Sequence, residues 1–209
     1  MRRKGAASDG DRDVFLNVPF DSTYEPMYVA LITGLCALGL TPRSVVETPP
    51  GTDRLRRLVS LIRSCACSIH DLSQVGLSDG PTRVPRFNMP FELGVAVAIA
   101  QARPSHHWFM FEAERFRLQK SLSDVNGYDP FIHDGKPDGV LKAIKGMFHW
   151  PEPRPNIKDL RALLLDVKLL VRTLKREHAL GSFFDKTGFG LLVLGVQKLV
   201  SGKHRPLWR

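Results

Sequence analysis

The expected fold and site follow from one stretch of the sequence, VPRFNMPFELGVAVAIA, which covers residues 84–100. A proline is compatible with a helix only near its start, so Pro90 marks the beginning of a helix. Asn88 is expected to cap it. From residue 91 to residue 100 every residue except Glu92 is apolar or glycine, which predicts a helix buried on all sides. A carboxylate at the start of such a helix requires an explanation.

Glu92 has three explanations. A capping box fits poorly: with Asn88 as the cap the paired position is Phe91, and with Met89 as the cap the side chain has no capping group. A second explanation is that Glu92 only complements the helix dipole. The functional explanation is a carboxylate that the helix N-terminus keeps ionised and that points into a cleft.

The segments around this helix alternate between strand and helix patterns. Buried strands are predicted at 13–18, 42–47, 65–69, 107–111 and 131–132, and helices at 27–38, 53–62 and 139–147. This alternation predicts an α/β fold with a parallel sheet and helices on both faces. Such sheets bind ligands beyond the carboxyl ends of their strands, where the winding direction changes.

Residues that directly follow the first three strands are therefore the candidates for a site. Each also has a plain structural explanation: Asp21 as a helix cap, Asp71 as a cap or turn residue, and Phe20 as part of the core. The candidates at the strand ends are Asn17, Phe20 and Asp21, then Glu47, and then Asp71 and Ser73.

The chain divides into three parts. Residues 1–12 are expected to form a disordered tail, residues 13–150 the α/β domain, and residues 156–209 a helical extension after a proline-rich linker at 151–155. The extension has a strong amphipathic pattern from Ile157 to Leu174 and a shorter apolar run from Phe189. This pattern favours a helical hairpin packed on the domain, with self-association or contact with acidic lipid as alternatives.

Charge is unevenly distributed along the 209 residues, whose net charge is +9. Residues 1–153 carry 18 Lys and Arg against 17 Asp and Glu, whereas residues 154–209 carry 12 against 4. The basic extension is therefore the part expected to meet an acidic partner, nucleic acid or acidic lipid.

Composition limits the class of protein. No apolar run is long enough to cross a membrane, and the charged N-terminus has no apolar segment behind it, so no signal peptide is expected. Three cysteines without a CxxC pair, Cys36, Cys65 and Cys67, are typical of reduced thiols in a cytoplasm. No group of Cys and His has the spacing of metal ligands, so no metal site is expected.

Four elements of the sequence, in order, resemble a known superfamily. They are NVPFD at 17–21, IHDLS at 69–73, RFNMPFELG at 86–94 and SLSD at 121–124. The first three look like parts of nucleoside 2-deoxyribosyltransferases, and the whole set is similar to bacterial Toll/interleukin-1 receptor (TIR)-like proteins. The resemblance covers residues 13–147 and implies a flavodoxin-like fold.

The resemblance also implies a reaction, cleavage of the N-glycosidic bond of NAD or a related nucleotide. It places Glu92 at the ribose, where a carboxylate can stabilise or attack the positive charge that builds on C1′. Asp71 is the second catalytic candidate, for the ribose hydroxyls or the leaving base. NAD is then a substrate, and no cofactor is expected. Candidates for substrate binding are Asn17, Phe20, Asp21, Tyr24, Ser73, Arg86 and Asn88.

Different classes of function remain open. The first is an enzyme acting on NAD or a related nucleotide, as a bacterial antiphage defence effector or signal-producing enzyme that works as a homo-oligomer. The second is a non-catalytic TIR-like module that binds a nucleotide signal and oligomerises. A nucleoside deoxyribosyltransferase is a further alternative, whereas a nucleic-acid-binding protein has only the basic extension in its favour. Two arginines of the loop before the helix, Arg83 and Arg86, favour a substrate with phosphate groups.

Overall fold

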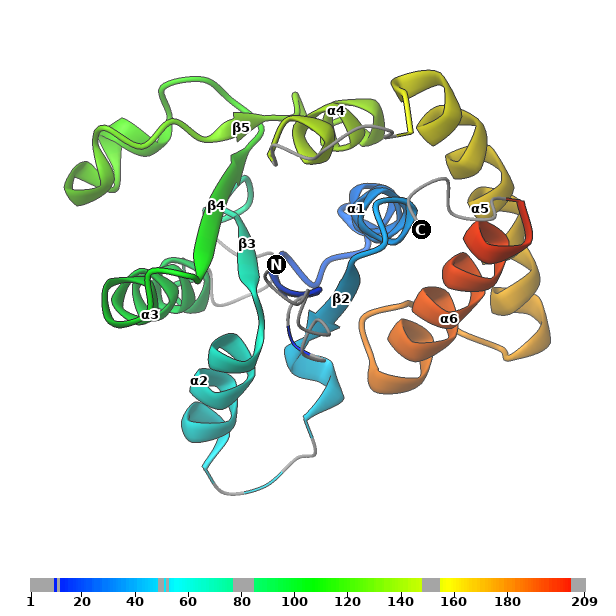
Figure 1. The fold of residues 1–209 in the computed structure, drawn as a ribbon, viewed down its shortest axis with the longest axis horizontal. Coiled ribbons are helices and arrows are strands. Elements are labelled where there is room, and N and C mark those ends of the chain that lie inside the picture. Colours follow the sequence, from blue (N-terminus) through cyan, green and yellow to red (C-terminus); the bar gives the residue numbers. More distant parts are fainter. Residues whose placement is uncertain are drawn as a thin grey trace, which may run out of the picture.

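The centre of the molecule is a five-stranded parallel sheet in the order β2-β1-β3-β4-β5. The structure is a computed structural model and describes residues 10, 12–48, 51, 53–76, 85–147 and 155–203. The strands are β1 (Asp13–Asn17), β2 (Thr41–Ser44), β3 (Cys67–Asp71), β4 (His107–Glu112) and β5 (Phe131–Ile132). The predicted α/β fold of flavodoxin-like type is therefore confirmed (Figure 1).

Helices cover both faces of this sheet (Figure 1). On one face lie α2 (Arg54–Ser64) and α3 (Asn88–Ala102), and on the other lie α1 (Glu25–Ala37) and α4 (Pro137–Met147). Side chains along β1 alternate between them: Phe15 packs with the residues of α2 and α3, whereas Leu16 packs with those of α1. Short 3-10 helices complete the elements, at Val45–Glu47, Leu118–Lys120 and Ser123–Val125.

Two C-terminal helices form a further layer outside α1. They are α5 (Ile157–Glu177) and α6 (Lys186–Lys203), and they pack against α1 and against each other. As a result α1 is buried on all sides from Met27 to Ala37. Lys175 of α5 donates a hydrogen bond of 2.5 Å to Glu25 at the start of α1. The hairpin thus supplies the apolar cover that an all-apolar outer helix requires.

The structure corrects two expectations about α3. Phe87 is the residue that precedes the helix, and no side chain caps it, so Asn88 is the first helical residue and not the cap. The helix is also not buried all round, since it buries one stripe and leaves Phe91 53% exposed. The apolar sequence of a helix does not show whether another helix covers its outer face. The hairpin covers α1 in this way, but no described helix lies outside α3.

Some expectations lie outside the described residues. These are most of the tail at 1–12, most of the linker at 151–155, and the loop from 77 to 84, which includes Arg83. The three cysteines are buried and unpaired with one another. Among the helices that the structure describes, none combines the length and the apolar character needed to cross a membrane.

Candidate functional site

A pocket of about 200 Å³ lies where the winding of the sheet reverses, beyond the carboxyl end of β1. Parallel sheets place their ligands at this point. Its exposed lining is mostly polar and includes Glu92, and apolar side chains complete it. The lining residues are Leu16, Asn17, Val18, Pro19, Phe20, Val45, Arg54, Arg86, Asn88, Met89 and Glu92. The structure therefore brings together five of the predicted site residues, namely Asn17, Phe20, Arg86, Asn88 and Glu92.

Glu92 has an electrostatic environment opposite to the expected one. It is the fifth residue of α3, beyond the first turn where the helix dipole acts, and only 8% of it is exposed. Burial raises the pKa of its carboxyl to about 7, against a smaller opposing effect of Arg54. No described residue donates a hydrogen bond to the carboxylate. The expectation that the helix start keeps Glu92 ionised is therefore wrong, and the group titrates near neutral pH.

Asn17 is held in one orientation by its neighbours. Its side-chain Nδ2 lies 2.8 Å from the carbonyl oxygen of Met89, which can only accept, so this atom of the amide is the nitrogen. The same Nδ2 lies 2.9 Å from Nδ1 of His70. Both hydrogens of the amide nitrogen are thus used, and Oδ1 remains for a ligand in the pocket that Asn17 lines.

The bond to His70 continues as a buried chain between the sheet and α3. His70 Nε2 lies 2.9 Å from Ser68 Oγ, which lies 3.2 Å from His106 Nε2, and His106 Nδ1 lies 3.2 Å from the carbonyl oxygen of Cys65. The chain begins at the Met89 carbonyl oxygen and ends at that of Cys65, and both can only accept. From Asn17 onward each group therefore donates to the next, until His106 Nδ1 donates to Cys65. Burial lowers the pKa of His70 to about 3 and also lowers that of His106, so both rings are neutral and the chain keeps its direction at pH 7.

Asp71, the second catalytic candidate, lies on the opposite face of the sheet from Glu92. It shares its face of β3 with Cys67 and Ile69, which pack toward α1, and it does not line the Glu92 pocket. Its Oδ2 accepts a hydrogen bond from the Tyr24 hydroxyl, and its Oδ1 accepts one of 2.9 Å from the Ser73 N–H.

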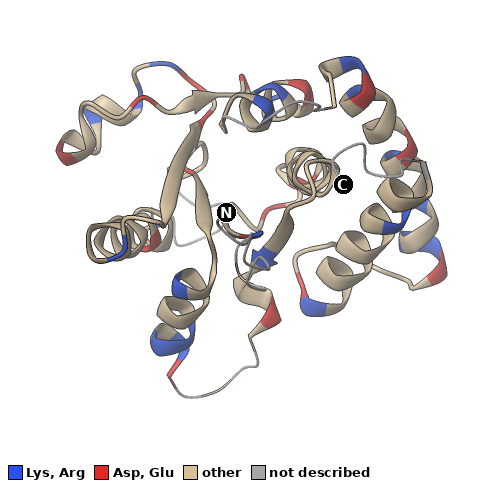
Figure 2. Ribbon diagram, viewed as in Figure 1, with Lys and Arg blue, Asp and Glu red and all other residues tan. Residues whose placement is uncertain are grey.

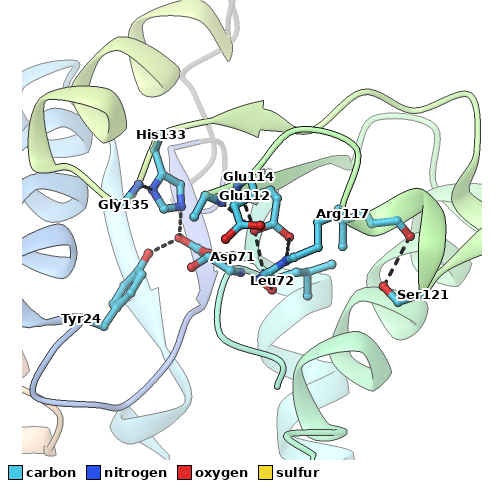
Figure 3. A network of polar contacts seen from close by, with 12 residues as sticks. Tyr24, Asp71, Leu72, Glu112, Glu114, Arg117, Ser121, His133 and Gly135 are labelled. Carbon is cyan, nitrogen blue, oxygen red and sulfur yellow. Dashed lines mark hydrogen bonds and ion pairs between the residues drawn. The ribbon is translucent and has the colours of Figure 1, made fainter. Parts of the chain in front are cut away.

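His133 completes the surroundings of Asp71, with its Nε2 3.2 Å from Oδ2 (Figure 3). The Gly135 N–H donates to Nδ1 of His133, so the ring proton lies on Nε2 and faces the carboxylate. Burial opposes ionisation, but contacts with His133, Ser73 and Tyr24 lower the pKa of Asp71, while burial raises that of Tyr24. The group thus joins the ends of β3 and β5 to the start of α1. The structure places Tyr24 here and not in the pocket.

Asp21 and Ser73 line a second pocket, which shares Arg86 with the first. Arg86 forms an ion pair of 2.9 Å with Asp21. Hydrogen bonds from Thr23 and Arg86 lower the pKa of Asp21 to about 2. Asn88 and Phe20 stand at the edge of the first pocket, and the Phe20 ring stacks on Phe184 of the C-terminal hairpin with centroids 5.5 Å apart.

Sequence reasoning missed four residues of this region: Arg54, His70, Arg117 and His133. His70 lies within the predicted IHDLS element beside Asp71, but no sequence signal placed His133 against Asp71. The spacing of Glu112, the last residue of β4, and Arg117 was a usable signal for an ion pair, which measures 2.8 Å. Arg117 also donates to the Leu72 carbonyl oxygen at 2.7 Å. Glu47, in contrast, is tied to Arg43 and to the Ser44 N–H.

In the described residues, no group of three or more His, Cys, Asp and Glu side chains is placed to hold a metal ion.

Comparisons with other proteins add no relative. No protein-family model matches the chain. Searches of curated proteins and of solved structures find no significant match either.

Proposed function

We propose that the protein cleaves the N-glycosidic bond of NAD or a related nucleotide, with Glu92 as the carboxylate at the ribose. The observation that supports this most is a buried carboxylate that receives no hydrogen bond from any described residue, in a pocket at the switch point of the sheet. Titratable groups with strongly shifted pKa values in a pocket are characteristic of active sites. The apolar side chains of the lining, such as Phe20 and Met89, suit a sugar or base ring.

The chemistry needs the ionised form of Glu92. As the bond between C1′ and the nicotinamide nitrogen breaks, the electron pair leaves with neutral nicotinamide, and the positive charge passes to the ribose. An ionised carboxylate beside C1′ stabilises this charge, and a cationic substrate favours ionisation of a group with a pKa of about 7. Water then adds to C1′, and one proton is released.

Asn17 gives the pocket a second, fixed contact. Its free Oδ1 accepts a hydrogen bond and so matches a ribose hydroxyl, while its nitrogen is committed to Met89 and His70. Asp71 has no direct role in this proposal, because its carboxylate is enclosed by Tyr24, Ser73 and His133 on the other face. We infer that it acts by holding the strand ends that carry the pocket.

A second candidate is a TIR-like module that binds a nucleotide signal without cleaving it. The enclosure of Asp71 favours this candidate, because it leaves Glu92 as the one carboxylate among the described residues that line the first pocket. The resemblance to TIR-like proteins suggests a place in bacterial defence for both candidates.

The test is release of nicotinamide from NAD by the purified protein at low and high concentration, beside Glu92→Gln. Glu177→Gln is the matched control, since Glu177 is exposed at the end of α5. We expect release by the unchanged protein and by the control, and none by Glu92→Gln. Binding of NAD without release at either concentration would favour the non-catalytic module, and release that survives Glu92→Gln would refute the site.

A further inference from the structure

The second pocket has a different chemical character from the first. It has a volume of about 260 Å³ and is lined by Asp21, Thr23, Ser73, Gln74, Gly76, Arg86 and Arg117. No large apolar side chain is among them, whereas the lining of the first pocket includes Leu16, Phe20 and Met89. Two guanidinium groups face one carboxylate, so the lining has an excess of positive charge. A water molecule occupies about 30 Å³ in the liquid, so the space is large enough for a phosphate group.

Its arginines are fixed in place but keep free donors. Arg117 is held by the buried Glu112 through Nε at 3.0 Å and Nη2 at 2.8 Å, and Nη2 also donates to the Leu72 carbonyl oxygen (Figure 3). No described residue accepts from its Nη1. Arg86 uses Nη2 for Asp21 and Nη1 for Gln74, at 2.9 and 3.4 Å. A guanidinium that is already oriented loses little side-chain entropy when it binds an anion.

The one carboxylate in this lining, that of Asp21, already accepts hydrogen bonds from its neighbours. Asp21 accepts from the backbone N–H and the hydroxyl of Thr23, at 2.8 and 2.7 Å, in addition to Arg86. Ser73, in contrast, has a buried hydroxyl with no hydrogen-bond partner among the described residues. Leaving such a group unpaired is unfavourable. A ligand oxygen in the pocket would satisfy it.

We propose that the second pocket binds a phosphate group of the substrate, through the Ser73 hydroxyl and the free N–H groups of Arg117 and Arg86. This inference rests on the proposed function, because it assigns a subsite of the same substrate. Arg86 lines both pockets, so the sugar lies beside Glu92 and its phosphate lies across Arg86. The substrate is then a nucleotide, and a nucleoside without phosphate binds weakly.

The experiment measures binding in the full chain carrying Glu92→Gln, so that turnover does not interfere. Titration calorimetry compares AMP with adenosine. We expect AMP to bind at least tenfold more tightly, and Ser73→Ala to reduce AMP affinity about fivefold without changing that for adenosine. Ser73→Ala removes only an unpartnered hydroxyl, so it leaves folding intact, which thermal unfolding verifies. Ser64→Ala, at an exposed serine on α2, is the control.

Arg117→Gln is the second variant, and it should also remove the preference for AMP, while Arg161→Gln on α5 should not. Inorganic phosphate distinguishes a subsite from a separate anion site: it should compete with AMP and leave adenosine binding unchanged. Equal affinity for AMP and adenosine, or a preference that survives both variants, would overturn the proposal. The binding experiment requires no cleavage of the ligand. It therefore tests the phosphate subsite whether or not the protein releases nicotinamide from NAD.

Discussion

At the scale of single residues, the raised pKa of Glu92 affects folding as well as chemistry. The carboxyl titrates at about 7 in the folded chain, against an ordinary value of 4.5. The folded state therefore binds more protons than the unfolded state between these values. Stability consequently falls as the pH rises from 4.5 to 7, and the deficit is complete above 7.

Glu92→Gln should remove this deficit. We expect the variant to be more stable than the unchanged protein at pH 8, by on the order of 3 kcal/mol, and to be equally stable at pH 4. Urea denaturation at the two pH values measures the difference. Glu114→Gln, at an exposed residue after β4, should change neither value. A gain of equal size at both pH values would mean that burial does not raise the pKa of Glu92.

Asn17→Asp tests the direction of the buried hydrogen-bond chain. The substitution replaces two donated bonds by a carboxylate beside the Met89 carbonyl oxygen and the His70 lone pair. We expect a loss of about 1–3 kcal/mol in the free energy of unfolding at pH 8. We also expect the pKa of His70 to rise, which NMR titration of the ring detects. Asn156→Asp keeps an acceptor at the N-cap of α5 and should be tolerated. Unchanged titration of His70 would contradict the assignment of donors.

At the scale of elements, Asp71 fastens β3 and β5 to the start of α1. Asp71→Asn should lower the free energy of unfolding by about 1–3 kcal/mol at pH 7, because the His133 N–H loses its acceptor charge. The folded pKa of Asp71 lies below the ordinary value of 3.8. Its stabilisation is thus complete above that value and declines as the pH falls through the folded pKa.

Denaturation between pH 7 and pH 3 measures this difference, which should narrow below about pH 4. Asp129→Asn, at an exposed loop residue, should show no difference at either end of the range. If the two proteins differ in free energy of unfolding by the same amount down to pH 3, Asp71 stabilises the fold by its shape and not by its charge.

The sequence predicted the elements better than their contacts. Short apolar runs such as VFL in β1 identify buried strands, and their alternation with helices specifies a parallel sheet. The partners of Asp71 were not predictable, because His133 reaches it only through the position of β5 at the edge of the sheet. The pKa of Glu92 was mispredicted for a related reason, since its burial depends on neighbours from β1 and α2 that lie far away in the sequence.

At the scale of the whole molecule, the C-terminal hairpin is coupled to the pocket through an aromatic contact. Phe184 lies between Phe20, at the pocket wall, and Tyr28 of α1, with ring centroids 5.5 and 5.0 Å away. The uniformly apolar sequence of α1 was the signal that a further layer covers it. Most of the described Lys and Arg residues of the hairpin are exposed, and Figure 2 shows their positions along α5 and α6.

Phe184→Ala should weaken both stability and ligand binding. We expect a loss of about 2–3 kcal/mol in the free energy of unfolding and a severalfold weaker affinity of the Glu92→Gln protein for AMP, because Phe20 loses its support. Leu194→Ala, at a residue 57% exposed on α6, is the control and should change neither. A lower free energy of unfolding with unchanged affinity for AMP would show that the hairpin does not support the binding site.

The central claim is that the carboxylate of Glu92 carries the chemistry, and the pH dependence of nicotinamide release from NAD tests it most directly. We predict a rate that rises with pH about a midpoint near 7, where Glu92 ionises, and no release above background from Glu92→Gln at any pH. Release by Glu92→Gln with the same pH dependence as the unchanged protein would contradict the account.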